Sequence, residues 1–316
     1  MNTYSRAEIE SVIVKSELIR AVENGFLQYS AGNVTVPPVG HLAFTNPPGD
    51  VHIKYGAVKN GKTFTIKVSN GFYNNPKLGL PSSQGVVMVF SQETGVLEAL
   101  LFDEGLITDM RTAAAGAVVA KYLAPKDVKS VGVIGTGIQA RLQIEFLKEV
   151  RDFDTVYVYG RHEAPVNQYV KDMQFKGFNV LPCNSIDELV AQTNYIITTT
   201  PSSEPFLFVR HAKPGLHVTA MGADGPNKQE VDTSFFAKAD LIVVDSKSQC
   251  FNYSDTSFAL KERVIKEASV LELGQIIADP SLGRDDNEQI TFADLTGVAV
   301  QDIVTAELII RKLTSR

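Results

Sequence analysis

The 316-residue chain is 44% hydrophobic, which is enough for packed cores in about two domains. Its formal net charge of −6, without a basic arm or run, gives no electrostatic reason to expect nucleic acid as a partner. Two widely spaced cysteines argue against a disulfide framework or a structural zinc site, and no apolar segment resembles a secretion signal or reaches the roughly 20 residues of a membrane span.

We therefore expect a soluble, cytoplasmic α/β protein that binds no metal, and its first predicted element is a helix. Ser5 and Glu8 have the spacing of a capping box, in which each side chain caps the other residue's backbone N–H. Apolar residues then follow a 3.6-residue period to about Ser30. One helix is predicted over this stretch.

Two hairpins are expected next. Strand-like runs at 52–58 and 63–68 flank Asn60-Gly61, a strong hairpin signal because both residues tolerate positive φ. Runs at 85–91 and 96–102 indicate a second hairpin. The pattern predicts an α+β domain with an antiparallel sheet or open barrel.

The rest of the chain has a different pattern. After a predicted helix at 106–124, strands and helices alternate with short loops from residue 130, which is typical of a doubly wound parallel sheet. A last helix at 298–313 follows the final strand of this series. We predict a central Rossmann domain over residues 126–297 and a second domain built from residues 1–125 and 298–316.

The first turn of the Rossmann domain carries its clearest motif. A buried strand, Val131-Gly132-Val133-Ile134, leads directly into Gly135-Thr136-Gly137-Ile138-Gln139-Ala140 at the start of a helix. Glycines permit the tight turn and let a pyrophosphate approach backbone N–H groups at the positive end of the helix. A glycine-rich turn can exist without a ligand, but its place between strand and helix favours a nicotinamide dinucleotide.

The end of the second strand bears on which dinucleotide binds. An NAD site usually has Asp or Glu there to accept hydrogen bonds from the ribose hydroxyls. This chain instead has Arg161-His162, and Glu163 follows within the next predicted helix. Arg161, assisted by His162, could hold a 2′-phosphate, which favours NADP(H). If Arg161 is only a solvated loop residue, NAD(H) is equally possible.

Four segments in order along the chain resemble the ornithine cyclodeaminase/μ-crystallin family. They are Arg111-Thr112-Ala113-Ala114-Ala115, the turn at 135–140, Gly222-Ala223-Asp224-Gly225-Pro226-Asn227-Lys228-Gln229-Glu230 and Gly297-Val298-Ala299-Val300-Gln301-Asp302. The resemblance covers nearly the whole chain. It implies a Rossmann domain beside a substrate-binding and dimerisation domain, and hence a homodimer.

The resemblance also implies roles for three residues. Lys67 and Arg111 match the family's ligands for the substrate carboxylate, with Arg111 also beside the cofactor, and Asp224 matches its acid/base aspartate. Lys67 would also polarise an imine, so it counts with Asp224 as catalytic. Without the resemblance, these residues would be interpreted as a solvent-facing lysine, a helix-surface ion pair and a turn.

Further positions are carried over from the family, and one is missing. Thr296 is assigned to the substrate, and the remaining positions match cofactor contacts: Ser82, Gln139, Thr200, Met221, Gly222, Lys228 and Leu295. Cyclodeaminases have a second substrate arginine before the first strand, which this chain lacks. His52 and Lys54, on one face of a strand, could replace its contacts, Lys54 being the stronger candidate, or could face solvent.

These observations favour an NAD(P)H-dependent ketimine reductase. The expected reaction reduces pyrroline-2-carboxylate or piperideine-2-carboxylate to an L-amino acid such as L-proline. Three alternatives remain open: an ornithine cyclodeaminase that releases ammonia, a reductase of linear imino acids or amino acid dehydrogenase, and a non-catalytic NADP-binding protein like μ-crystallin. The missing arginine and the missing acid after the second strand both weaken the cyclodeaminase assignment.

Overall fold

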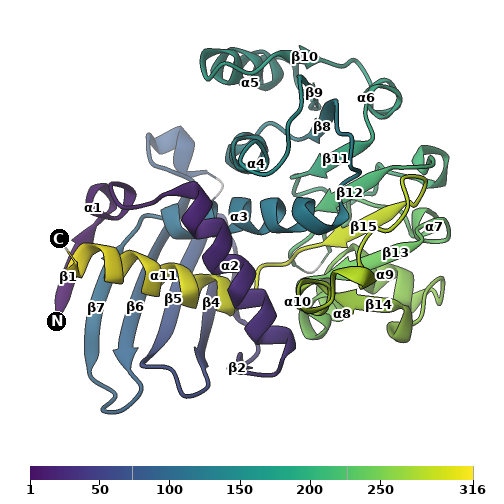
Figure 1. Ribbon diagram of the computed structural model, residues 1–316. Coiled ribbons are helices and arrows are strands. Elements are labelled where there is room, and N and C mark those ends of the chain that lie inside the picture. Colours follow the sequence, from purple (N-terminus) through teal and green to yellow (C-terminus); the bar gives the residue numbers. More distant parts are fainter. Residues whose placement is uncertain (73, 226, 316) are drawn as a thin grey trace. The chain divides into compact units, whose positions relative to one another are not determined.

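The computed structural model describes residues 1–72, 74–225 and 227–315. They form two compact units, Met1–Ala115 with Val298–Arg316 (unit 1) and Gly116–Gly297 (unit 2). The first boundary falls within a helix rather than at the predicted position 125/126, because that helix, rich in alanine, continues from one unit into the other. Figure 1 follows the chain through both units.

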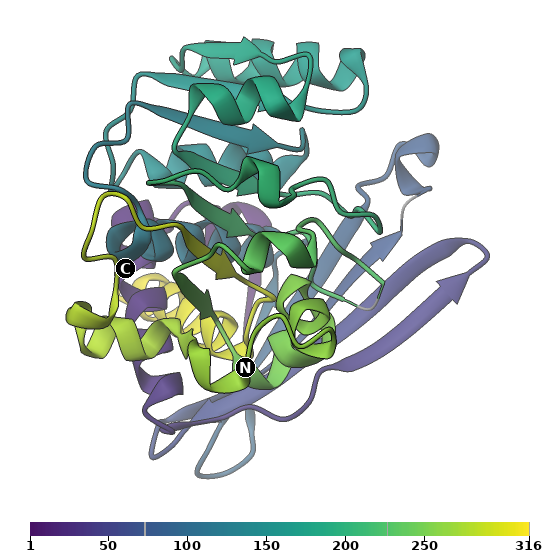
Figure 2. The same cartoon turned by 90° about the vertical axis from the view of Figure 1, so that its right-hand side faces the viewer.

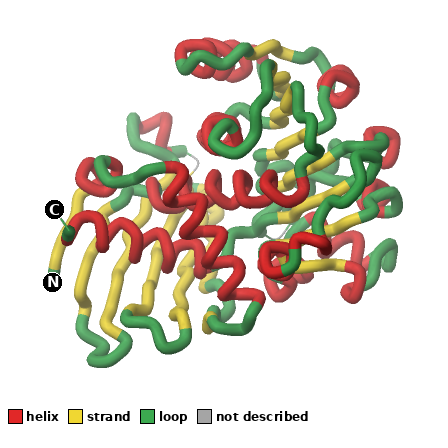
Figure 3. The backbone as a smooth tube through the Cα atoms, in the orientation of Figure 1, coloured by secondary structure: helices red, strands yellow, loops and turns green. Residues whose placement is uncertain are grey.

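Unit 1 contains one mixed sheet and helices drawn from both ends of the chain (Figure 3). Its described strands are β1 (Asn2–Ser5), β2 (Val34–Thr35), β3 (Gly40–Thr45), β4 (Pro48–Val58), β5 (Thr63–Phe72), β6 (Ser83–Ser91) and β7 (Leu97–Phe102). Its helices are α1 (Arg6–Glu10), α2 (Lys15–Ser30), the first part of α3 (Leu106–Leu123) and α11 (Ala299–Thr314).

The strand order in this sheet is β1-β7-β6-β5-β4-β2, with β3 paired to β4. The predicted antiparallel hairpins β4–β5 and β6–β7 are confirmed, and the short strand β1 adds a parallel edge that the sequence did not predict. Helix α11 contacts β4, β5 and α2, so the C-terminal helix packs on a sheet made from the N-terminal segment (Figure 1). Apolar side chains such as Val87, Leu101 and Ile309 are fully buried between these layers.

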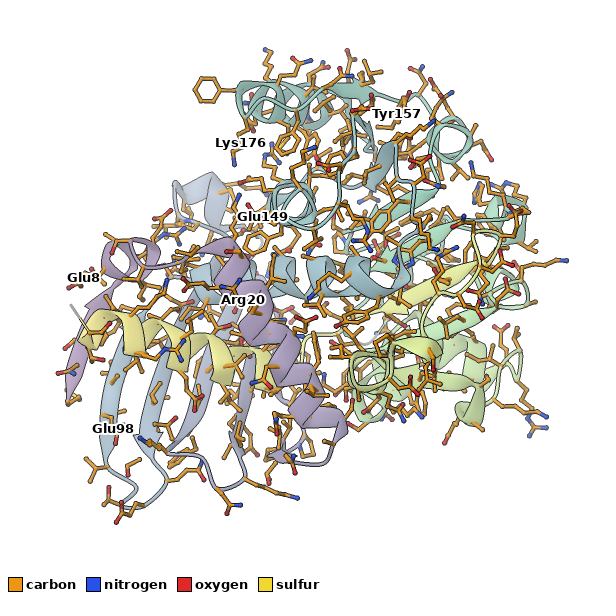
Figure 4. All side chains as sticks on the ribbon, in the orientation of Figure 1. Glu8, Arg20, Glu98, Glu149, Tyr157 and Lys176 are labelled. Carbon is orange, nitrogen blue, oxygen red and sulfur yellow. The ribbon has the colours of Figure 1, made fainter. Side chains whose placement is uncertain are left out.

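The first predicted helix is two helices. The capping box is confirmed, since Ser5 N–H donates to Glu8 at 2.8 Å and Glu8 N–H donates to the Ser5 hydroxyl; Glu8 lies at the start of α1 (Figure 4). Between α1 and α2 the chain leaves the helix at residues 11–14. This stretch contains three consecutive β-branched residues, Val12-Ile13-Val14, whose side chains lose rotamer freedom in a helix.

Unit 2 is built on a parallel sheet, as the alternating pattern predicted. Its described strands are β8 (Ser130–Ile134), β9 (Thr155–Tyr159), β10 (Val180–Pro182), β11 (Tyr195–Thr198), β12 (His217–Ala220), β13 (Leu241–Val244), β14 (Val270–Glu272) and β15 (Thr291–Asp294). Its further helices are α4 (Ile138–Leu147), α5 (Glu163–Phe175), α6 (Ile186–Gln192), α7 (Thr233–Phe236), α8 (Lys247–Tyr253), α9 (Asp255–Lys261) and α10 (Leu273–Ala278).

The strand order β10-β9-β8-β11-β12-β15-β13-β14 identifies the place where a Rossmann sheet binds its ligand. Chain order runs outward from the neighbours β8 and β11, to β9 and β10 on one side and to β12 on the other, where β15 separates β12 from β13. Helices α4 and α6 lie on opposite sides of β8 and β11 (Figures 1 and 2). Ligands of open α/β sheets bind at such a switch point, beyond the carboxyl ends of the strands. Among the described residues, none of the helices has the length and apolar character needed to cross a bilayer.

Candidate functional site

A pocket of about 510 Å³ opens in unit 2 at the switch point between β8 and β11. The ends of β8, β9 and β11 and the loops that follow them supply its walls. The lining residues are Ile134, Gly135, Thr136, Gly137, Tyr159, Gly160, Arg161, His162, Pro165, Ile186, Thr199, Thr200, Pro201, Ser202, Glu204, Pro205 and Phe206. Of the residues predicted to bind a cofactor, Gly135, Gly137, Arg161, His162 and Thr200 share this pocket.

Glycine is required at the first position of the turn. Gly135 has φ +118°, and a Cβ there would lie 2.5 Å from the Thr199 hydroxyl. At Gly137, the N-cap of α4, a Cβ would meet nothing within 4 Å, so the space in front of the helix is open. An open cradle at the start of a ten-residue helix fits a pyrophosphate group.

The remaining residues of this motif support the turn from behind. Ala140 is fully buried, and its carbonyl accepts a hydrogen bond from Tyr169 at 3.0 Å. Arg141 donates to the carbonyls of Thr136 and Gly137, which fixes the turn from the helix side. Ile138 is largely exposed and, like Gln139, is not among the lining residues.

Arg161 and His162 follow β9 and are both exposed at the pocket. His162 is the N-cap of α5, and Glu163 lies inside the first turn of that helix, as predicted. The end of β9 therefore presents a guanidinium group rather than a carboxylate to the pocket.

Glu230 is a residue that the sequence did not single out, although it closes one of the quoted segments. It is fully buried, and it accepts hydrogen bonds from the Thr198 hydroxyl, from the N–H and hydroxyl of Thr200, and from the N–H of Gly222, at 2.6–2.8 Å. Burial raises the pKa of Glu230 to about 7, against the effect of these donors. One carboxyl group thus ties the end of β11 to the end of β12.

Gly222 shows how closely these loops approach. A Cβ on Gly222 would lie 2.0 Å from the Thr200 carbonyl and 2.6 Å from the Glu230 carboxyl group. The preceding Met221 is buried, and its N–H donates to the Thr198 carbonyl at 3.1 Å. The predicted cofactor contacts Met221, Gly222 and Thr200 therefore belong to one hydrogen-bonded unit.

Further buried carboxyl groups hold the loop after β15. Asp245 accepts hydrogen bonds from the Thr296 hydroxyl at 3.1 Å and from the Gly297 N–H at 2.7 Å. Asp294, at the end of β15, accepts hydrogen bonds from the Ser254 hydroxyl and from the N–H and hydroxyl of Thr256 on α9. Burial raises the pKa of Asp294 to about 6. Leu295 is buried and its N–H donates to Ala220, so the predicted pair Leu295-Thr296 is held against the end of β12.

Asp224 is exposed and forms an ion pair with Lys228, with 2.7 Å between the Oδ1 and Nζ atoms. The two predicted residues thus lie together in the loop after β12. Pro226, part of the same quoted segment, lies outside the described residues.

A second polar cluster lies within unit 1 and is almost completely buried. Lys67, on β5, donates to Asp302 at 2.8 Å and to the Thr108 hydroxyl at 2.9 Å. Arg111, on α3, has its Nε atom 3.3 Å from the same carboxylate oxygen of Asp302 and donates to Gln301 at 2.7 Å. The structure therefore brings the predicted residues Lys67 and Arg111 together around a shared acid on α11.

The charges in this cluster do not balance. Burial lowers the pKa of Lys67 to about 7, because Asp302 only partly offsets the loss of hydration and the neighbouring cations Arg111 and Lys54 oppose the charge. Burial alone would raise the pKa of Asp302, but Lys67 and Arg111 keep it below its ordinary value. When Lys67 is charged, it and Arg111 share the Asp302 carboxylate, while burial raises the pKa of Asp103, which also interacts with Lys67, and so favours its neutral form. This arrangement favours the entry of a second anion.

Two buried donor atoms in the same cluster also favour a bound anion. Within the described residues, Arg111 Nε, Gln301 Nε2 and Asp302 Oδ2 have no hydrogen-bond partner. Unsatisfied buried polar atoms are rare in folded proteins and often mark a place where a ligand completes the network. A carboxylate could accept hydrogen bonds from the first two groups.

The other predicted residues of unit 1 are Lys54, His52 and Ser82. Lys54 pairs with Lys67 across β4 and β5, so both side chains are on the same face of the sheet, and His52 follows on that face. Ser82 is exposed just before β6. Asp302 and Gln301, which the sequence quoted only as part of a motif, are the new members of the site.

The profile of the Ornithine cyclodeaminase/mu-crystallin family matches residues 1–316. The chain belongs to this family. The predicted resemblance and the predicted α/β fold with a Rossmann-like parallel sheet are both confirmed. The second sheet was expected to be antiparallel or an open barrel and is mixed, because β1 pairs with β7 in parallel.

Solved structures of family relatives are similar over the full chain. Thermococcus litoralis Δ1-pyrroline-2-carboxylate reductase in complex with NADH and L-proline has a TM-score of 0.93 at 32% identity, covering 100% of this chain and 98% of that one. An archaeal alanine dehydrogenase dimer with bound NAD has a TM-score of 0.91 at 32% identity, covering 100% and 96%. The iminosuccinate reductase of Paracoccus denitrificans in complex with NAD⁺ has 0.89 at 29% identity, covering 100% and 97%.

Proposed function

We propose that this chain is an NAD(P)H-dependent imine reductase that converts pyrroline-2-carboxylate or piperideine-2-carboxylate into the L-amino acid, L-proline in the first case. The observation that carries the proposal is the unbalanced cluster of Lys67 and Arg111 around Asp302, with its unsatisfied donors. A small carboxylate is the anion that this cluster fits. The relative from Thermococcus litoralis, solved with NADH and L-proline, supports the same substrate class.

Some of the site residues bind the substrate, and one transfers a proton. Lys67 and Arg111 hold the substrate carboxylate, and the planar fork of the guanidinium group suits that anion. A bound NADH or NADPH supplies the hydride that the imine carbon receives. Asp224, which is exposed, takes up a proton from water and passes it to the imine nitrogen as the hydride adds, so that C=N becomes CH–NH. Thr296 and Lys54 complete the substrate contacts.

Purified protein assayed with a panel of imino acids tests this function. Consumption of NADPH or NADH with pyrroline-2-carboxylate, and its loss in Lys67→Met and Arg111→Met, is the expected result. The names of the alanine dehydrogenase and iminosuccinate reductase relatives suggest linear imino acids as substrates. If this chain prefers such a substrate, the reaction is still an imine reduction and only the substrate differs. Ammonia release from ornithine without added cofactor would establish a cyclodeaminase instead, and no turnover of any substrate would favour a binding protein.

We further propose that NADP(H) is the preferred cofactor. Arg161 and His162 line the pocket where an NAD site usually has a carboxylate. In Arg161→Ala the KM for NADPH should rise about tenfold or more while the KM for NADH changes little, since a charge-assisted contact contributes roughly 1.5–3 kcal/mol. Lys171→Ala, which removes an exposed cation from α5, is the matched control. Equal use of NADH and NADPH by the parent protein would contradict the preference.

We also propose a cytoplasmic homodimer. Leu42 (55% exposed), Phe44 (44%) and Tyr55 (38%) lie on the face of β3 and β4 opposite to Lys54, and such an exposed apolar sheet face is typical of an interface. The archaeal relative described as a dimer supports this assembly. Light scattering should give twice the chain mass of 34.5 kDa, and Leu42→Lys with Phe44→Lys should shift it toward the monomer.

A further inference from the structure

Three side chains that can bind metal ions meet on the β3–β4 hairpin of unit 1. His41 lies directly opposite His52 in the strand register, with 4.9 Å between the ring centroids. Asp50 is two residues before His52 and therefore on the same face of β4, with its Oδ1 atom 3.7 Å from the Nε2 atom of His52. One ligand atom from each of the three lies within 4.8 Å of the others.

The register places these three residues beside one another on one face of the sheet. Cross-strand neighbours in an antiparallel pair have Cβ atoms about 4.5–5.5 Å apart, and residues two apart on one strand project to the same side. Both relations hold here, so the hairpin keeps the two imidazoles and the carboxylate adjacent as long as β3 and β4 are paired. The cluster is a property of the sheet and does not depend on a flexible loop.

The types of ligand select the kind of ion. Two imidazole nitrogens and one carboxylate oxygen are ligands for Zn²⁺ and its neighbours Co²⁺, Ni²⁺ and Cu²⁺, whereas Mg²⁺ and Ca²⁺ prefer oxygen ligands alone. Bonds of about 2.0–2.1 Å place tetrahedral ligand atoms roughly 3.3 Å apart, so the ligand atoms must approach one another by up to about 1.5 Å. His52 and Asp50 are 24% and 22% exposed, and His41 is exposed, which leaves room for a water as fourth ligand.

We propose that His41, Asp50 and His52 bind a divalent transition-metal ion of the zinc class. The ion joins β3 to β4 on the face that also carries Lys54, two residues after His52. Because it binds the paired hairpin and not the unfolded chain, it stabilises unit 1 by an amount that grows with the logarithm of its concentration once that exceeds the Kd. The site is independent of the proposed reductase activity, and its test does not use that activity.

Binding is measured on the full chain after removal of any affinity tag and treatment with a chelator. Titration with Zn²⁺ by calorimetry should show one ion per chain, and Co²⁺ should give the visible absorption of a site with nitrogen ligands. His41→Gln and Asp50→Asn should each weaken Zn²⁺ binding at least tenfold and reduce the rise in Tm at a given Zn²⁺ concentration accordingly. Leu42→Gln, next to His41 but on the other face, is the matched control and should bind as the parent does.

Two results would overturn the proposal. One is a parent protein that binds neither ion, and the other is a His41→Gln protein that binds as tightly as Leu42→Gln. Circular dichroism and Tm without metal establish that each variant is folded. His52→Gln gives a second, independent loss of an imidazole, so a failure of one variant to fold still leaves the site testable.

Discussion

At the scale of single residues, the buried ion cluster in unit 1 controls the pH dependence of the proposed reaction. Lys67 has a pKa of about 7 in the free protein, so it is charged below pH 7 and neutral above it. Only the charged form holds a carboxylate. We expect kcat/KM for the imino acid to fall as the pH rises through about 7, because kcat/KM reports ionisations of the free enzyme.

The variant Lys67→Arg tests whether the ionisation of Lys67 causes the fall in kcat/KM. The guanidinium group remains charged throughout the accessible range, so the variant should lose the fall near pH 7, with a lower but flatter kcat/KM. The measurement is a pH profile of kcat/KM from pH 5.5 to 9 for parent and variant. If the same fall persists in Lys67→Arg, it belongs to another group or to the substrate, and the role given to Lys67 is wrong.

Asp302 is the partner that keeps two buried cations in place. Asp302→Asn removes the carboxylate between Lys67 and Arg111 and should destabilise the protein by about 3–5 kcal/mol, the usual effect of breaking a buried ion pair. It should also move the fall in kcat/KM to lower pH, since the charged form of Lys67 loses its counterion. Urea unfolding and the pH profile check the two effects separately. Glu307→Gln, also on α11, is the control, and an equal loss of stability there would contradict a special role for Asp302.

The motifs in the sequence led to Lys67 and Arg111 but not to Asp302, for a physical reason. Lys67 and Asp302 are 235 residues apart, and neither local periodicity nor a turn signal reports a contact over that distance. Asp302 also lies one turn into an amphipathic helix, where an acid is ordinary. The same applies to Glu230, since only the approach of two strand ends shows that its carboxyl group is buried between them.

At the scale of secondary-structure elements, Glu230 connects β11 to β12. Its pKa is raised to about 7 by burial, from 4.5 in an unfolded chain. Its contribution to stability is therefore fully present below about pH 4.5 and is lost as the pH rises through 7. Glu230→Gln cannot ionise, so the free energy of unfolding of the variant relative to the parent should increase between pH 5 and pH 8.

Glu230→Ala separates the hydrogen bonds from the charge. It leaves donors of Thr198, Thr200 and Gly222 unpaired in a buried place, each at a cost of about 1–3 kcal/mol. We expect a marked loss of stability at every pH and weaker dinucleotide binding, because Thr200 lines the pocket. Denaturant unfolding at pH 5 and pH 8 compares the three proteins. A parallel pH dependence in Glu230→Gln and the parent would show that Glu230 does not titrate in this range.

The elements themselves were predictable where sequence period and burial agree. In unit 2, most strands and helices lie within a few residues of their expected positions, because parallel strands buried on both faces stand out as apolar runs. In unit 1, the short strands β1, β2 and β3 were missed, since an edge strand of few buried residues has little apolar signal. The region of α8 to α10 was missed for a similar reason, as these helices are seven residues or shorter.

At the scale of the whole molecule, unit 1 depends on both ends of the chain while unit 2 is continuous. Helix α11 supplies buried residues such as Ile303 and Ile309 to unit 1, in addition to Asp302. A chain ending at Gly297 lacks all of them. We expect unit 1 to lose its packing in this truncated chain, because the sheet face under α11 is then exposed and Lys67 has no counterion.

Unit 2 should respond differently to the same truncation, since its pocket is built entirely from residues 134–206. The truncated chain should therefore still bind NADPH, less tightly only by the contacts expected from Ser82 and Arg111 in unit 1, while having no reductase activity. Hydrogen exchange followed by mass spectrometry should show lost protection in β5 and β6 and retained protection in β8 and β11, and NADPH fluorescence measures binding. A chain ending at Thr314 controls for removal of the terminus itself. If both units lose protection together, unit 2 cannot fold without unit 1. The division of the chain into an independent cofactor unit and a dependent substrate unit would then be wrong.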